Sequence, residues 1–212
     1  MVKISPISEE SIAEAAEALR AGALIAFPTE TVYGLGADAT NDRAVAEIFA
    51  AKGRPNFNPL IVHLPDRGAA EAFVTFNEMA GLLADRFWPG ALTLVLPTLV
   101  KLPAALLKDG RVGVRLPDDP ICRRLILQFG RPITGTSANV TGQPPAMTAD
   151  EVTRMLGSKV DYVLEAGRAQ GGTPSTVLSL GPEGARVLRK GAIPDNTLLD
   201  TLKALGVSAS VA

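Results

Sequence analysis

Short apolar runs of strand length alternate along this chain with longer stretches in which apolar residues recur at helical spacing. The runs predict strands at 23–27, 60–64, 91–96, 112–116, 132–136, 162–164, 175–180 and 185–188. The helical spacing predicts helices at 9–20, 42–52, 68–74, 77–87, 120–129 and from 149 to about 157. Interspersed strands and helices favour a layered α/β fold. The closing strands follow one another without helices, so we expect a mixed sheet.

Helix-start signals support several of these ranges. Ser8 precedes Glu9 and Glu10, which suits an N-cap followed by an acidic first turn. Pro120 stands where proline is tolerated, in the first turn of its helix. Thr148 and Glu151 have the spacing of a capping box.

Composition and charge narrow the class of protein. Of the 212 residues, 47% are hydrophobic and 20% are charged, which is ordinary for a globular domain. The net charge of −1 provides no global field toward nucleic acid or anionic lipid, so any anion site must be a local cluster. The single cysteine, Cys122, rules out an internal disulfide, and the longest apolar stretch, 91–96, is too short to span a membrane. We therefore expect a cytoplasmic protein without a membrane segment.

Polar segments rich in small residues follow several predicted strands, at 28–31, 115–118, 135–139 and 171–175. In open α/β sheets, ligands bind in crevices at strand ends, so these segments could line one site. The same residue types also dominate ordinary turns, which is the alternative for any one segment alone.

A basic segment ends the helix predicted at 42–52. Lys52 and Arg54 flank Gly53, and Asn58 follows in a stretch without acids. Two cations with a flexible residue between them can close on one polyanion, although a basic helix C-terminus that pairs with the helix dipole explains them equally well. No P-loop or dinucleotide-binding glycine motif is present, so neither standard mode of nucleotide binding is supported.

Other polar residues are ambiguous by themselves. His63 is the only histidine and ends an apolar strand, a position that is more often structural than catalytic, and a zinc site is not expected. Arg115 follows a Val-Gly-Val strand, where it can bind an anion or form a surface ion pair. Ser137 and Ser175 lack a Ser-His-Asp context or a GxSxG motif, which disfavours a hydrolase.

Seven runs in order resemble the YrdC/TsaC-type threonylcarbamoyl-AMP synthase family over about residues 8–193. They are PTETVYGLGAD, AKGRPNFNPLIVH, WPGALTLVL, VGVRLPDDP, PITGTSAN with VTGQPP, TPSTVLSL, and VLRKGAI. The resemblance implies a twisted mixed α/β sheet with flanking helices around a concave basic cavity. It also implies a catalytic domain over 1–200 and a short tail over 201–212. Some members carry a further C-terminal domain, and we expect this chain to work as the single-domain form.

The resemblance also assigns residues. The family's KxR and SxN signatures fall on Lys52, Arg54, Ser137 and Asn139, which are implied to be catalytic and to surround the ATP phosphates. The remaining positions that it implies face ATP are Asn58, Arg111 (through its backbone) and Arg189, and those it implies hold L-threonine are Thr31, His63, Arg115 and Ser175, with the Gly135 backbone nearby.

The implied enzyme is a nucleotidyltransferase, L-threonylcarbamoyladenylate synthase. It converts L-threonine, bicarbonate and ATP into threonylcarbamoyl-AMP and pyrophosphate, for threonylcarbamoyladenosine modification of tRNA. Mg²⁺ is expected to arrive with ATP, downstream threonylcarbamoyl-transferase proteins are the expected partners, and contact with tRNA is possible.

Three alternatives stay open. One is a double-stranded-RNA-binding module of the same fold without catalysis, against which the small hydroxyl-rich loops argue. Another is a carbamoyl-transfer domain of the kind found in hydrogenase maturation, which normally belongs to a longer chain with zinc-type cysteines. The last is a weakly active paralogue.

Overall fold

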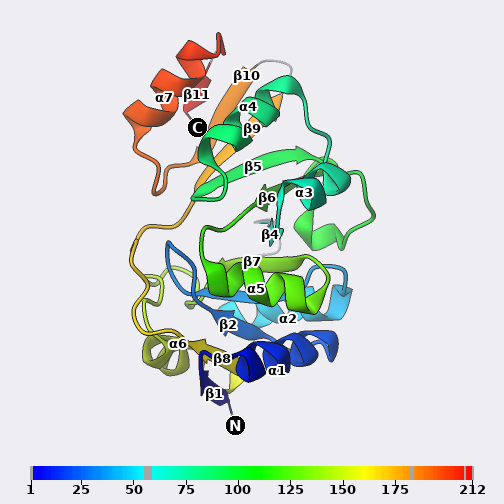
Figure 1. Ribbon diagram of the computed structural model, residues 1–212, viewed down its shortest axis with the longest axis vertical. Helices are drawn as coiled ribbons and strands as arrows, with labels where there is room; N and C mark the ends of the chain where they lie inside the picture. Colours follow the sequence, from blue (N-terminus) through cyan, green and yellow to red (C-terminus); the bar gives the residue numbers. More distant parts are fainter. Residues whose placement is uncertain (1, 55–58, 182–183, 208, 212) are drawn as a thin grey trace.

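A single mixed sheet organises the computed structural model, which describes residues 2–54, 59–181, 184–207 and 209–211. Within these residues eleven strands pair in the order β1-β8-β2-β3-β7-β4-β6-β5-β9-β10-β11, with parallel and antiparallel neighbours (Figure 1). The expected mixed α/β sheet is therefore confirmed. The strands are β1 Lys3–Pro6, β2 Ile25–Phe27, β3 Gly34–Asp38, β4 Ile61–His63, β5 Leu92–Pro97, β6 Arg111–Arg115, β7 Ile133–Ser137, β8 Tyr162–Glu165, β9 Thr176–Gly181, β10 Gly184–Arg189 and β11 Ala209–Val211.

Helices cover the sheet where the amphipathic spacing places them. They are α1 Glu9–Arg20, α2 Asp42–Lys52, α3 Arg67–Phe73, α4 Glu78–Phe87, α5 Pro120–Phe129, α6 Ala149–Leu156 and α7 Asp195–Ala204, with short 3₁₀ turns at Ala104–Leu106 and Gly157–Lys159. The side chain of Ser8 accepts the Ser11 N–H and caps α1, and that of Asn41 caps α2. Thr148 caps α6, whereas Glu151 accepts the Met147 N–H at 2.6 Å, one residue before the cap.

Two apolar clusters lie on the sheet. In one, α1 and α5 pack together over the strands that carry Ile25, Phe27 and Ile133. Figure 1 shows these two helices on the same side of the lower half of the sheet. The larger cluster includes α2, α4 and α6 and extends to α7. Helices therefore pack on both faces of β2, because Ala26 belongs to the larger cluster and its neighbours Ile25 and Phe27 belong to the other.

Strand β3 was not predicted, because its sequence, GLGAD, carries two glycines that weaken the strand signal. The glycines are needed for packing. A Cβ at Gly36 would lie 2.5 Å from the Thr134 carbonyl oxygen and 2.7 Å from the Phe27 ring. The neighbouring strands approach so closely that only glycine fits, which brings the preceding polar loop next to the central strands.

The C-terminal segment joins the main sheet. Leu198 and Leu202 of α7 are buried, and β11 pairs in parallel with β10. The expected boundary between residues 200 and 201 therefore falls inside α7. In the part of the chain that is described, no helix is long and apolar enough to cross a membrane.

Candidate active site

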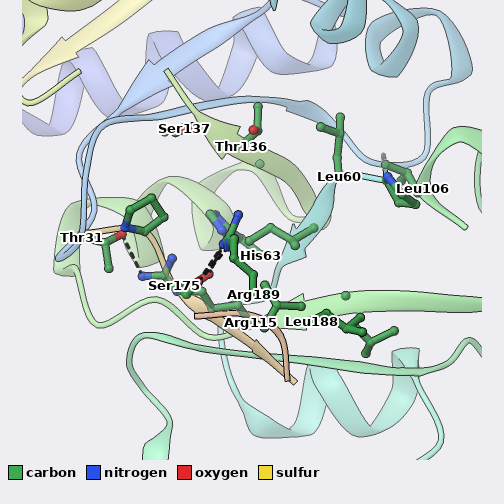
Figure 2. A pocket seen from close by; sticks show the side chains of 18 of the residues that line it. Thr31, Leu60, His63, Leu106, Arg115, Thr136, Ser137, Ser175, Leu188 and Arg189 are labelled. Carbon is green, nitrogen blue, oxygen red and sulfur yellow. Dashed lines mark hydrogen bonds between the residues drawn. The ribbon is translucent and has the colours of Figure 1, made fainter. Parts of the chain in front are cut away.

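A cavity of about 390 Å³ lies over one face of the sheet, where alternating residues of the strands, such as Ile61 and His63 of β4 and Gly113 and Arg115 of β6, line it (Figure 2). Its wall comes from the loop before β3, the segment that leads into β4, strands β5 and β6, the end of β7, and the segments around 174–177 and 188–189. The size suits a small-molecule ligand. Residues from each of the four predicted polar segments line the cavity, among them Thr31, Arg115, Ser137 and Ser175, whereas Lys52 and Asn139 do not.

The cavity wall is cationic. The lining residues with positive side chains are Arg54, Lys108, Arg111, Arg115 and Arg189, and none of the described lining residues is acidic. A concave wall with one sign of charge concentrates ions of the opposite sign. The charge of the cavity wall therefore favours an anionic ligand, although the net charge of the chain is −1.

Arg115 lies in the polar part of the wall and is held by three groups. Its Nε donates to the Gly90 carbonyl at 3.0 Å, and one Nη donates to the Glu30 carboxylate and to Thr31 Oγ1, 3.3 Å away (Figure 2). The Arg115 side chain is 4% exposed. These contacts fix the guanidinium, so its remaining N–H groups are preorganised donors toward the cavity, although the Glu30 carboxylate offsets its charge.

Thr31 is positioned by its own loop. Thr29 Oγ1 lies 2.8 Å from Thr31 Oγ1 and donates to the Val32 carbonyl at 2.6 Å. The Thr29 hydroxyl also accepts the main-chain N–H groups of Thr31 and Val32, each at 3.2 Å. This local turn, typical of threonine, directs the Thr31 hydroxyl toward Arg115.

His63 lines the cavity with both ring nitrogens buried and without a hydrogen-bond partner among the described residues. Burial lowers the pKa of His63 to about 3, and the positive charge of Arg115 contributes in the same direction. The imidazole is therefore neutral at physiological pH, with one donor and one acceptor nitrogen. A Cβ at Gly135 would lie 2.7 Å from His63 Cε1, so glycine makes room for the ring.

Ser175 and Arg189 form one hydrogen-bonded unit in the cavity wall (Figure 2). Arg189 donates to the Ser175 carbonyl through Nε at 3.1 Å and through Nη2 at 2.8 Å, and Nη2 also donates to Ser175 Oγ at 3.0 Å. Burial lowers the pKa of Arg189, followed by the charges of Arg115 and Arg54, but an arginine keeps its charge. The resemblance assigns Arg189 to ATP and Ser175 to threonine, and the structure shows the two side chains in direct contact.

Lys52 lies beneath the cavity wall. Its ammonium donates to the carbonyls of Ser137 and of Asn139, the latter at 2.6 Å, and to Asn139 Oδ1 at 3.3 Å. The residue is 1% exposed. Burial, with a contribution from the nearby charge of Arg54, lowers the pKa of Lys52 to about 7. The three acceptors match the three N–H groups of an ammonium, so Lys52 holds the 137–139 loop.

The same loop uses the amide of Asn139. Its Nδ2 donates to the carbonyls of Val140 at 2.9 Å and Gln143 at 2.7 Å. Ser137 is the member of the SxN pair that lines the cavity. The described side-chain contacts of Asn139 are therefore with its own loop and with Lys52, and none of them leads into the cavity.

The other residues assigned to ATP have different environments. Arg54 lines the cavity and donates to the Pro59 carbonyl at 3.3 Å. The guanidinium of Arg111 donates to the carbonyls of Val95 and Leu180, and its backbone N–H and carbonyl pair with Lys108, each at 3.0 Å. Asn58 lies outside the described residues.

Sequence reasoning assigned no role to three residues that shape the site. Lys108 adds a positive charge to the wall, Glu30 pairs with Arg115, and Thr93 bonds Ser175. Glu30 lies within the PTET run and Thr93 within the LTLVL run, so position beside a motif is the one available signal. The partners of Glu30 and Thr93 are 85 and 82 residues away, so no local pattern shows these contacts.

In the described ranges, no group of three or more His, Cys, Asp or Glu side chains is arranged to hold a metal ion.

Comparison with known proteins gives consistent matches. The Sua5/YciO/YrdC family model, described as telomere recombination, matches residues 17–191. A threonylcarbamoyl-AMP synthase from Bacillus subtilis is 42% identical over 189 residues, which cover 88% of this chain and 55% of that protein. A putative threonylcarbamoyl-AMP synthase from Methanocaldococcus jannaschii is 33% identical over 92% of this chain and 94% of its own length.

A solved structure gives the same result. Pyrococcus abyssi Sua5 in complex with L-threonine superposes with a TM-score of 0.90 and 38% identity, covering 99% of this chain and 62% of that one. The chain spans about half the length of the curated relatives from B. subtilis and P. abyssi. The family match extends over most of this chain, and the fold is shared. The chain therefore belongs to the Sua5/YciO/YrdC family.

Proposed function

We propose that this chain is an L-threonylcarbamoyladenylate synthase, which makes threonylcarbamoyl-AMP and pyrophosphate from L-threonine, bicarbonate and ATP. The observation that carries the proposal is a cavity whose wall is cationic, lacks acidic side chains among the described lining residues, and includes the neutral His63. Such a wall suits phosphate and carboxylate groups together. The family and the names of the relatives support the same chemistry.

The reaction has two bond-forming steps. The threonine amine attacks the carbon of bicarbonate and, with loss of water, gives a carbamate. A carbamate oxygen then forms a bond to the α-phosphorus of ATP, and the bond from that phosphorus to the bridging oxygen breaks, so pyrophosphate leaves with the electron pair. Negative charge on phosphate oxygens is the main feature that a catalyst has to stabilise, and a protein nucleophile is not required.

The cations of the wall fit these needs. Arg54 and the Ser137 hydroxyl, which both line the cavity, would bind phosphate oxygens, and Lys108 adds charge to the same wall. Arg189 links the phosphate region to Ser175. Preorganised charge of this kind stabilises a developing anion without reorganisation during the reaction. Mg²⁺ would enter as MgATP, carried by the phosphate oxygens.

The polar part of the cavity is the proposed threonine site. Arg115 would pair with the amino-acid carboxylate, and Thr31, Ser175 and the free nitrogens of His63 would hydrogen-bond the rest of the molecule. The neutral state of His63 suits a hydrogen-bonding role better than acid–base transfer at neutral pH. Figure 2 shows Leu60 and Leu106 apart from Thr31, so an apolar surface remains for the nucleotide.

Double-stranded RNA is a poor fit for this cavity. A protein that binds an RNA duplex contacts it across roughly 16 base pairs, whereas the cationic groups here surround about 390 Å³. We propose that the product passes to threonylcarbamoyl-transferase proteins that act on tRNA, because a mixed carbamoyl-phosphate anhydride is an activated donor that a second enzyme must consume. A direct contact with tRNA remains part of the proposal.

The test is product formation. The purified chain is incubated with ATP, MgCl₂, L-threonine and ¹³C-bicarbonate, and mass spectrometry follows the adenylate. We expect threonylcarbamoyl-AMP with one ¹³C atom, together with pyrophosphate, only when both threonine and bicarbonate are present. Threonine-independent hydrolysis of ATP as the sole activity would contradict the proposal.

A further inference from the structure

Thr93 is a fully buried threonine next to the proposed threonine site. It lies in β5, is 0% exposed and does not line the cavity. Its Oγ1 lies 2.9 Å from Ser175 Oγ, and within the described residues this is the one hydrogen bond of the Thr93 hydroxyl. A strand threonine in an apolar core would be replaced by valine without loss unless its hydroxyl were needed, so its partner matters.

The orientation of this hydroxyl is fixed by packing. Gly113 of the neighbouring strand β6 faces Thr93, and a Cβ there would lie 3.2 Å from the Thr93 methyl carbon and 3.1 Å from Ile61 Cγ2. The glycine therefore leaves the space that the methyl group occupies. Because a β-branched side chain has few χ1 states, the position of the methyl also sets the position of Oγ1.

The direction of the bond follows from the proton count. Arg189 Nη2 donates to Ser175 Oγ at 3.0 Å, and a guanidinium can only donate, so Ser175 accepts there. If Ser175 also donated to Thr93, the Thr93 proton would be buried with no acceptor in the described part of the chain. A buried donor without a partner is rarer and costs more than a lone pair without one. Thr93 therefore donates to Ser175.

With two donors directed at Ser175 Oγ, its own proton is the group left for the cavity. We propose that Thr93 is a positioning residue that fixes the Ser175 hydroxyl as a hydrogen-bond donor to an acceptor oxygen of the bound amino acid. The inference rests on the proposed function, because it takes threonine as the ligand of this wall. It adds a residue outside the cavity and a polarity, donor rather than acceptor, for Ser175.

Binding of L-threonine, measured by calorimetry on the full chain without ATP, tests this separately from catalysis. Thr93→Val removes the donor and keeps the shape, and we expect about fivefold weaker threonine binding, the effect of one neutral hydrogen bond. Thr93→Ser keeps the hydroxyl and should bind threonine within about twofold of the wild type. ATP affinity should be the same in all three proteins.

A double-mutant cycle separates positioning from a general structural effect. In a Ser175→Ala background, Thr93→Val should change threonine affinity by less than about twofold, because the hydroxyl that it positions is gone. Thr134→Val is the matched control. Thr134 is also 0% exposed on a central strand, but its hydroxyl bonds the Ile61 carbonyl at 3.1 Å. This control should leave threonine affinity unchanged.

The outcomes are distinguishable. Unchanged or tighter threonine binding by Thr93→Val would overturn the inference and leave the proposed function intact, because it would mean that Ser175 donates to Thr93. An equal loss in the Ser175→Ala background would also overturn it. A wild-type chain that binds no threonine would overturn the proposed function, and the inference with it.

Discussion

The polar groups beneath the 137–139 loop and those on the cavity wall differ in whether their hydrogen-bonding atoms are already used. The Lys52 ammonium meets three oxygens of the loop. His63 is equally buried, but both of its nitrogens are unpaired among the described residues. Both side chains come from runs that resemble the same family, yet only His63 lines the cavity.

This difference distinguishes a residue that supports the fold of the site from one that contacts the ligand. A buried polar group that is fully paired with protein stabilises the fold, and little of its bonding capacity remains for a ligand. A buried polar group without partners is costly unless something binds to it. We therefore infer that Lys52 acts through the 137–139 loop, and that His63 meets substrate.

Lys52→Met breaks the supporting region and should have the largest effect. It leaves the carbonyls of Ser137 and Asn139 and the Asn139 side-chain oxygen without their donor. We expect the free energy of unfolding to fall by about 3 kcal/mol, measured by urea titration, with most activity lost. Unchanged stability, with a loss confined to ATP affinity, would show that Lys52 contacts the nucleotide instead.

Arg54→Ala is the counterpart on the cavity wall and sharpens the contrast with Lys52. Since Arg54 lines the cavity, we expect the dissociation constant for ATP to rise about 10- to 100-fold, the effect of losing charged hydrogen bonds to phosphate. The free energy of unfolding should change by less than about 1 kcal/mol. ATP affinity equal to that of the wild type would mean that the phosphate site is elsewhere.

His63 predicts a pH dependence of stability. Its pKa in the folded chain is about 3, below the ordinary value of 6.5, so between these values the unfolded chain binds more protons. The free energy of unfolding should therefore fall as the pH falls through this window. The expected loss from this one group between pH 7 and pH 5 is about 2 kcal/mol.

The control for this pH effect is His63→Gln, which has no imidazole to titrate. Urea unfolding of both proteins at pH 7 and pH 5 gives the comparison. We expect the variant to lose about 2 kcal/mol less than the wild type over this interval. Equal losses would show that His63 becomes protonated in the folded state at an ordinary pH.

Much of the fold could be predicted from the sequence, because its signals are local. The limits of α1 and α5 agree with the ranges predicted from caps and spacing. Strand β3 was missed because close contacts with Phe27 and Thr134 require its glycines, and glycine weakens the strand signal. Phe27 is separated from β3 by a loop and Thr134 is distant in the sequence, so no local pattern shows these contacts. Strand β1 was missed because it is short and largely exposed, which leaves no apolar run to detect.

The sequence predicted which residues belong to the site better than it predicted the contacts between them. Motif resemblance selected positions such as Thr31, Arg115 and Ser175 that share one cavity wall. It could not show that Lys52 turns beneath the loop, or that Glu30 pairs with Arg115, because these contacts depend on the folded chain. A motif identifies which residues belong to a site, whereas burial and hydrogen-bond pairing in the folded chain indicate what each residue does there.

The most direct test of this account is the selectivity among threonine, serine and valine, measured as kcat/KM for adenylate formation. Serine lacks one methyl group, which is worth ~1–3 kcal/mol, or roughly 10–200-fold. Valine keeps the shape but leaves the hydrogen-bonding groups of the wall unpaired, which is the larger penalty. The account predicts that valine is rejected more strongly than serine. A higher kcat/KM with valine than with serine would contradict it, because the polar groups of the cavity would then not hydrogen-bond the substrate hydroxyl.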